Sequence, residues 1–238
     1  MRVNSPSSGV RGERADSRRN RATLLAEAIQ LIAEHGPDVK LDQIARAAGV
    51  GNATLYRHFP DRAALLRAIA VQVIGACAEA AERALAEETG SFEALARYLH
   101  EVLRVRVAWV MPAIAAALEP GDAELTALRG RSVAAFTTLI ENAQRDGAIR
   151  ADITFGDIGQ LLIRLARPLP PGHDRAVQDA AAQRHLAIML AGMRPSGGPL
   201  PGTGLTLADL RRPGPAPPVP VIPDPAAGTP GGADRIEE

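Results

Sequence analysis

The stretch Leu41–Phe59, LDQIARAAGVGNATLYRHF, decides the fold of the first part of this chain. Apolar side chains recur at helical spacing on both sides of Gly49-Val50-Gly51. Ile44 and Leu55 occupy the positions where the two helices would meet, and Gly49 can adopt the left-handed conformation that a tight turn requires. The stretch therefore predicts two short helices that cross at a turn, a helix-turn-helix.

The second helix of this pair presents polar groups on its outer face. Asn52, Ala53, Tyr56 and Arg57 lie on that face and leave little apolar surface exposed. Amide, hydroxyl and guanidinium groups in this arrangement can read base edges in the major groove of DNA. The alternative is an ordinary packed helix corner, in which Arg57 is a solvated surface residue.

Outside this stretch the chain also favours helices, because aromatic residues make up only 3% of it and runs of β-branched residues are scarce. We therefore predict an all-α fold. Periodicity and stop signals predict further helices over residues 17–35, 62–88, 91 to the region of Pro112, 122–146, 155–166 and 174–193. Asp61, Asp122 and Asp174 are expected as N-caps, and Thr154 with Asp157 as a capping box.

Four regions follow from these patterns. Residues 1–16 are predicted to be a flexible arm, 17–66 a helix-turn-helix domain, 67–194 a helical body and 195–238 a disordered tail. The tail contains 11 of the 19 prolines and 8 of the 22 glycines, and it has few large apolar side chains to offset the entropy of ordering.

Charge and composition exclude several classes of protein. The 27 basic and 27 acidic residues balance, but residues 1–67 carry 11 Lys/Arg against 7 Asp/Glu, which favours a nucleic-acid contact confined to this region. A single cysteine, Cys77, excludes an internal disulfide and a Cys-rich zinc site. No export signal, membrane span or nucleotide-binding or hydrolase motif is present, so we expect a cytoplasmic protein that is not an enzyme and needs no cofactor.

The segment GVGNATLYRHFPDRAAL, residues 49–65, resembles the DNA-binding signature of the tetracycline-repressor (TetR/AcrR) family of bacterial transcriptional regulators. The resemblance covers about Arg18 to Ile69, and the C-terminal half more loosely resembles an SbtR-like subgroup. It implies an all-helical homodimer with a three-helix DNA-binding domain. It also implies a larger C-terminal domain that binds a small molecule and dimerises through its last two helices.

The resemblance also implies roles for individual residues. Backbone phosphate or sugar contacts are implied for Thr54, Tyr56, His58 and Arg62, base contacts for Asn52, Ala53 and Arg57, and phosphate or minor-groove contacts for Arg18, Arg19 and Arg21. Lys40 is counted among the DNA contacts, although the family usually has a Thr or Ser cap there, which leaves Asp38 as a substitute cap. Gly51 and Ala53 also depart from the commoner Ser and Gly.

In the body, Arg106 falls on an otherwise apolar stripe, where a guanidinium must be paired or face a cavity. We expect an effector pocket for an anionic or polar ligand, lined by His100, Arg106, Trp109, Met111 and Phe136. The alternative is that Arg106 extends past the stripe to Glu101, Glu141 or solvent.

Two apolar faces near residue 190 predict a dimer interface of four helices. They consist of Ile158, Leu161, Leu162 and Leu165 on one helix and Leu186, Met189 and Leu190 on the next. Closing the core of the monomer is the alternative. Together with the family resemblance, these patterns predict a homodimeric repressor that binds a palindromic operator in double-stranded DNA and is released by a small-molecule effector. The alternative function is a helical small-molecule-binding or scaffold protein with a vestigial DNA-binding module.

Overall fold

The computed structural model describes residues 8–36, 38–105, 110–111, 114–115, 118, 120–167 and 172–207, with side chains from residue 16 onward. None of these residues lies in a strand, which confirms the all-α class. The helices are α1 (Ser8–His35), α2 (Leu41–Ala47), α3 (Asn52–His58), α4 (Arg62–Glu87), α5 (Ser91–Val105), α7 (Ala123–Arg145), α8 (Phe155–Leu165) and α9 (Arg175–Met193). Their bounds lie close to the predicted ones, except at the start of α1.

Side-chain caps fix where four of these helices begin. Three aspartates accept a hydrogen bond from a backbone amide three residues ahead: Asp61 from Ala64 (2.7 Å), Asp122 from Leu125 (3.0 Å) and Asp174 from Val177 (2.9 Å). Thr154 and Asp157 form the capping box of α8. These bonds satisfy amides that have no partner within the helix, so the predicted caps are confirmed.

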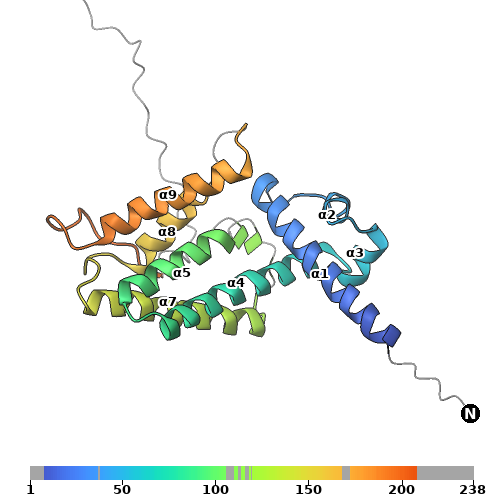
Figure 1. Ribbon diagram of the computed structural model, residues 1–238, viewed down its shortest axis with the longest axis horizontal. Helices are drawn as coiled ribbons and strands as arrows, with labels where there is room; N and C mark the ends of the chain where they lie inside the picture. The colour runs from blue at the N-terminus through green and yellow to red at the C-terminus, as the bar shows by residue number, and fades with distance from the viewer. Residues whose placement is uncertain are drawn as a thin grey trace, which may run out of the picture.

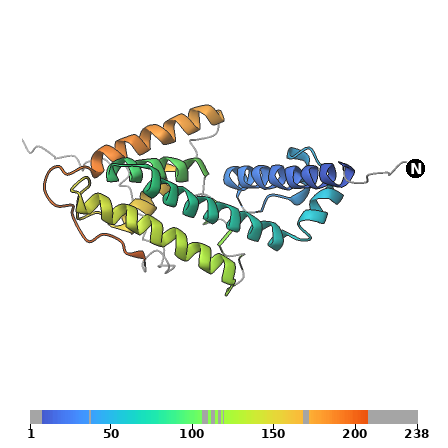
Figure 2. The same cartoon turned by 60° about the horizontal axis from the view of Figure 1, so that its bottom comes forward.

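The molecule has two parts joined by one long helix (Figure 1). Helices α1, α2 and α3, which we call the N-terminal module, gather at one end, and α4 begins there and continues into the body. Within the body, α4 packs against α7 and α5, while α9 packs against α5 and α8. Figure 2 shows the same division after rotation, with α4 passing from the module into the layer of body helices.

Each part has its own apolar core, and α4 contributes to both. The module core joins α1, α2 and α3 to the first half of α4 and also includes Val110, Ile114 and Leu125. The body core joins the second half of α4, from Cys77 onward, to α5, α7, α8 and α9. No linker separates the two parts, because body residues complete the core of the module.

Within the described part of the chain, α4 is the one helix long and apolar enough to cross a membrane by length and composition. Half of its most apolar window is buried inside the protein. Its contacts with α1, α5 and α7 account for its apolar character, since it is the central helix of two cores.

The start of α1 differs from the sequence prediction. We expected a flexible arm up to residue 16, but α1 begins at Ser8, more than four turns before Leu24, the first buried residue among the side chains that the structure describes. Once a helix is nucleated, each added residue gains a backbone hydrogen bond at little further cost, so it can extend beyond its packed region.

The segment after α9 also differs from the prediction of disorder from Pro195. Its backbone lies against the start of α8: Thr154 Oγ1 donates to the carbonyl of Leu205 (2.6 Å), and the Leu205 amide donates to Asp157 Oδ1 (3.3 Å). The Leu200 amide donates to Asp152 Oδ2 (2.8 Å), and Arg150 donates to the carbonyls of Ser196 and Gly198. We call residues 196–205 the C-terminal strap.

The strap is held by polar side chains that bind its backbone, whereas the prediction of disorder considered only apolar burial. Gly156 lets the strap approach closely, since a side chain there would overlap the Leu205 carbonyl. The rest of the expected tail, residues 208–238, lies outside the described residues.

Candidate nucleic-acid interface

The crossing of α2 and α3 is fixed by the turn between them. Gly49 adopts a left-handed conformation with φ of 67°, and the Val50 amide donates to the carbonyl of Ala45 at 3.0 Å. Ile44 and Leu55 are buried where the two helices meet, as predicted. A side chain with a Cβ would strain the backbone at position 49, so the turn holds α3 at one angle.

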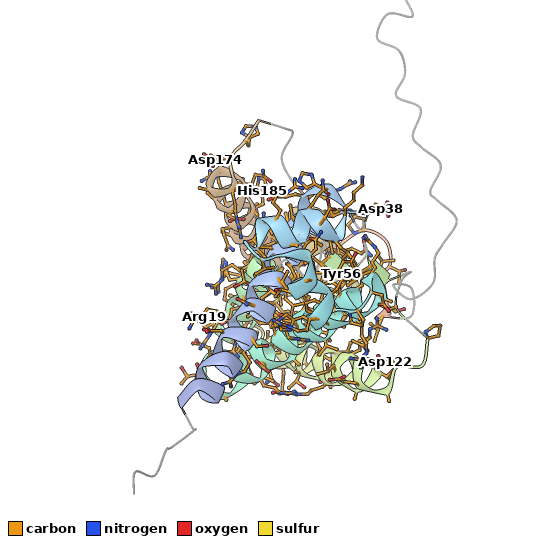
Figure 3. All side chains as sticks on the ribbon, turned by 90° about the vertical axis from the view of Figure 1, so that its right-hand side faces the viewer. Arg19, Asp38, Tyr56, Asp122, Asp174 and His185 are labelled. Atoms are coloured by element: carbon orange, nitrogen blue, oxygen red, sulfur yellow. The ribbon has the colours of Figure 1, made fainter. Side chains whose placement is uncertain are left out.

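The opposite face of α3 is uncovered. Asn52, Ala53 and Arg57 are exposed, Thr54 is half-buried, and the Tyr56 side chain is 51% exposed although its ring is largely apolar. Figure 3 looks onto the end of the molecule that carries the N-terminal module, and Tyr56 lies on this end. The polar and aromatic face that the sequence predicted is therefore open to a partner.

Cationic side chains of α1 border this face. Arg18, Arg19 and Arg21 are exposed, and Arg19 lies 3.7 Å from Asp16 in an ion pair whose partners are both mostly solvated. The guanidinium of Arg21 lies over the ring of Phe59, 5.2 Å from its centroid. Because Phe59 directly follows α3, this contact holds one cation of α1 beside the end of α3. Arg19 and Tyr56 are both labelled on this end in Figure 3.

Two residues to which the resemblance assigns phosphate contacts, Arg62 and His58, are partly buried in the protein. The half-buried guanidinium of Arg62 donates to the Val39 carbonyl at 2.7 Å, which ties the start of α4 to the chain just before α2. The Nε2 atom of His58 is buried and has no hydrogen-bond partner among the described residues. Burial, together with the positive charges of Arg57 and Arg21, lowers the pKa of His58. His58 therefore adds no positive charge to this face near neutral pH.

The start of α2 is not capped as expected. Lys40, not Asp38, occupies the N-cap position, and its side chain makes no cap hydrogen bond. Its backbone amide donates instead to Oε1 of Gln43 at 3.1 Å. The side chain of Lys40 is exposed at the edge of the module, whereas Asp38 lies two residues too early to reach the free amides of α2.

Of the five residues expected to line an effector pocket, Arg106 and Trp109 lie outside the described residues, and the other three do not come together. Phe136 lies in the body core, with ring centroids 4.8 Å from Tyr98 and 4.7 Å from Phe155. Met111 packs against the module core. His100 borders a cavity. Glu101, considered as a partner of Arg106, pairs with Arg83 and Arg97 at 2.9 and 3.4 Å. Phe136 and Met111 therefore pack in different cores, because helical periodicity does not reveal which core a residue joins.

The cavity beside His100 has a volume of about 630 Å³ and lies between α5, the end of α8 and α9. We call it the α5–α9 cavity. Its lining consists of His100, Leu103, Arg104, Ala166, Arg167, Arg175, Gln178, Asp179, Ala182 and Gln183. Sequence reasoning missed all of these except His100, since they come from three helices whose packing no local pattern specifies.

A second hollow, of about 580 Å³, lies on α8 and α9 and is almost entirely apolar; we call it the α8–α9 hollow. Leu161, Leu165, Ile188 and Met189 line it, with the Leu161 side chain 41% and the Ile188 side chain 61% exposed. The predicted interface residues Ile158, Leu162, Leu186 and Leu190 are instead buried in the core of the protomer. These four residues help to close the monomer core, as in the alternative interpretation, and Ile158 also borders the α8–α9 hollow.

An ionic joint connects the first half of α4 to the start of α7. Arg67 Nε donates to Asp122 Oδ2 at 2.6 Å, and Arg67 Nη2 donates to Glu124 Oε2 at 2.7 Å. The hydrogen bond from Arg67, with that from the backbone amide of Leu125, lowers the pKa of Asp122. The sequence predicted Asp122 only as a cap and gave no signal for its pairing with Arg67.

Comparison with known proteins agrees with this arrangement. Residues 24–69 match the model for bacterial regulatory proteins of the tetR family, and residues 90–195 match that for the C-terminal domain of SbtR-like transcriptional regulators. The TetR transcriptional regulator SCO0520 from Streptomyces coelicolor has a similar structure, with a TM-score of 0.53 and 32% identity over 74% of this chain and 99% of that one. This chain belongs to the TetR family. It is therefore a DNA-binding transcriptional regulator in which a helix-turn-helix domain precedes a helical C-terminal domain of the SbtR-like type.

Other TetR proteins are similar over parts of the chain or in fold. The HTH-type transcriptional repressor LfrR of Mycolicibacterium smegmatis is 44% identical over 66 residues, so the match spans 28% of this chain and about a third (34%) of that curated relative. The structure of LfrR in complex with proflavine has a TM-score of 0.52 and 27% identity over 71% of this chain and 95% of that one. PfmR from Thermus thermophilus, at 23% identity and a TM-score of 0.51 over 72% of this chain and 99% of its own, shares the fold.

Proposed function

We propose that this TetR-family regulator is a homodimeric repressor that binds a palindromic operator and leaves it when a small molecule binds the body. The observation that carries the proposal is the uncovered face of α3. Tyr56 keeps half of its side chain exposed beside Asn52 and Arg57, while Leu55 on the opposite face is buried. An exposed aromatic ring among amide and guanidinium groups is suited to a DNA groove, where hydroxyl, amide and cationic groups meet phosphates and base edges.

The apolar surface of α8 and α9 supports a dimer. Leu161 and Ile188 are exposed large apolar side chains beside the α8–α9 hollow, whose lining is apolar except for Asp157 and His185. A two-fold axis through this surface would hold two α3 helices for two half-sites of a palindrome. The residues proposed for this interface are Leu161, Leu165 and Met189, which the sequence predicted, and Ile188, which it did not.

Repression and release by a small molecule are proposed from two observations. LfrR, which is similar to this chain over the DNA-binding region, is named a repressor and has a structure with proflavine. In this chain, α4 runs from the module into the body core, so a change in the body can reposition the module. A ligand weakens operator binding only by as much as it prefers the conformation that binds DNA poorly.

We further infer that the protein acts in the cytoplasm without a cofactor and is not an enzyme. Burial raises the pKa of the Cys77 thiol to about 12, so the thiolate needed for a nucleophile is scarce at neutral pH. Cys77 packs in the body core as a small apolar residue.

The test is fluorescence anisotropy of the full chain with DNA from the intergenic region beside its own gene, at two salt concentrations. We expect binding that is tighter than to random DNA and weakens steeply with salt, because phosphate contacts release counterions. The double variant Tyr56→Ala, Arg57→Ala should lose roughly 100-fold or more in affinity, since it removes the base contact assigned to Arg57, worth about 1–3 kcal/mol, together with the phosphate contact assigned to Tyr56 in each half-site. Both side chains are exposed, so the variant should fold normally by circular dichroism.

Arg184→Ala serves as the matched control, because Arg184 is an exposed arginine of α9 in the body. It should bind the DNA like the unmodified chain. Equal and weak binding of the unmodified chain and the double variant to any DNA would contradict the proposal.

A further inference from the structure

The α5–α9 cavity lies at the end of the body that faces the N-terminal module. His100 and Arg104 come from the second half of α5, and Arg175 to Gln183 from the first half of α9. Figure 1 shows that both of these helix ends point toward the module, and Figure 2 shows the same for α9. A molecule in the cavity would therefore touch the body where it is nearest to the DNA-binding end.

The lining of the cavity has an excess of positive charge. Three guanidinium groups, of Arg104, Arg167 and Arg175, border it, and Asp179 is the one carboxylate in its lining. Arg175 Nε lies 3.7 Å from Asp179 Oδ2, and both side chains are more than half exposed, so this pair is a weak one. The concentration of arginines is not a general feature of the body, because residues 68–167 carry 10 Lys/Arg against 13 Asp/Glu.

The lining of the cavity also includes apolar side chains and one contact between two polar side chains. Leu103 is buried, and Ala166 and Ala182 are half-buried small residues that leave space. His100 Nδ1 and Gln183 Oε1 lie 2.5 Å apart and connect α5 to α9. Nε2 is the second polar atom of the imidazole ring.

We propose that this cavity binds a small organic carboxylate with an apolar body, and that this ligand is the effector of the repressor. The carboxylate pairs with the arginines, which match its planar geometry with two parallel N–H donors. The apolar body lies on Leu103, Ala166 and Ala182. A volume of about 630 Å³ falls in the range of small-molecule sites and exceeds what an inorganic anion needs.

The assignment of the carboxylate as effector rests on the proposed function, whereas binding to the cavity does not. The ligand would bridge α5 and α9, and α5 packs against α4, the helix that enters the module core. A ligand bound in the cavity would therefore act, through α5, on α4, the helix that positions α3.

The experiment uses two probes of similar size and opposite charge, 2-naphthoate and 2-naphthylmethylammonium, titrated calorimetrically into the full chain without DNA. We expect 2-naphthoate to bind and the ammonium probe not to bind. The variant Arg104→Gln, Arg175→Gln should bind 2-naphthoate about tenfold more weakly or worse, because hydrogen bonds between charged groups are stronger than neutral ones. Arg184→Gln removes one charge from α9 outside the cavity lining and should bind like the unmodified chain.

Equal affinity for the two probes, unchanged affinity in the double variant, or no binding of 2-naphthoate up to about millimolar concentration overturns the assignment of the cavity. Operator binding is then measured with and without 2-naphthoate. A rise in the operator Kd in the unmodified chain but not in the double variant supports the effector role, and no rise overturns that role. A chain that fails to bind its operator contradicts the proposed function, while the calorimetric result for the cavity stands.

Discussion

The N-terminal module and the body build their surfaces in opposite ways. In the module, the residues of the uncovered face all lie in the seven residues of α3, and the same helix buries Leu55 on its other side. In the body, the α5–α9 cavity draws its lining from positions between 100 and 183, on three helices. A surface carried by one helix follows from the local pattern, whereas a surface shared by three helices exists only after they pack.

The two parts are nevertheless joined through shared structure. Val110, Ile114 and Leu125 of the body complete the core of the module, and Arg67 on α4 is paired with Asp122 and Glu124 at the start of α7. The helices of the module therefore follow from local sequence patterns, but the packing of the module depends on residues of the body. Substitutions and deletions that each disrupt one contact or one segment show how far each part acts without the other.

The substitution Ile188→Glu tests whether the module needs the outer surface of the body. The Ile188 side chain is 61% exposed and lines the α8–α9 hollow, so the new carboxylate does not enter the protomer core. In a dimer the charge would be buried without a partner, which is strongly unfavourable. We expect a monomer by analytical ultracentrifugation and an operator affinity at least about tenfold lower, because each DNA half-site then binds separately.

Val177→Glu is the control for this change. Val177 is also exposed and apolar on α9, at 46%, but it does not line the α8–α9 hollow. It should leave both mass and affinity unchanged. A dimeric Ile188→Glu variant with full affinity would show that the module does not depend on this surface.

The substitution Asp122→Asn tests the ionic joint between α4 and α7. Asparagine retains the N-cap of α7 but removes the charge that pairs with Arg67. Because the pairing lowers the pKa of Asp122, its ionised form favours the folded state. This stabilisation is fully present above the ordinary carboxyl pKa, near 4, and is lost as the pH falls through the lowered pKa.

We therefore expect the melting temperature of the Asp122→Asn variant to be a few degrees lower at neutral pH and to approach that of the unmodified chain at acidic pH. Differential scanning calorimetry between neutral pH and pH 2 measures this difference. Glu141→Gln, an exposed change on the same helix, should follow the unmodified chain throughout. If the two melting temperatures differed by the same amount at every pH, the charge of Asp122 would not be what stabilises the folded state.

Two C-terminal deletions give the smallest expected effect on DNA binding. Removing residues 208–238 should change operator affinity by less than about twofold and leave the melting temperature unchanged. Removing residues 195–238 also removes the strap that Thr154 and Asp157 bind, so the melting temperature should fall by a few degrees while DNA affinity is retained. If the removal of residues 208–238 alone caused a large loss of affinity, the end of the chain would have a role in DNA binding.

The sequence alone determined the helices and the face of α3. Asp61, Asp122, Thr154 and Asp174 were predicted as caps and are caps, and the turn at Gly49 has the expected conformation. These features depend on residues within about four positions of one another, so periodicity and capping chemistry suffice to predict them. The family signature lies in this same local stretch.

Only the tertiary structure decided which polar and apolar side chains remain exposed and available to bind a partner. It buried Ile158 and Leu186 but left Leu161 and Ile188 exposed on the same two helices, and it engaged Arg62 with the Val39 carbonyl. It also brought arginines of α5 and α9 to the same cavity. Each outcome depends on partners far away in the chain, because a helical pattern identifies an apolar face but not the element that covers it.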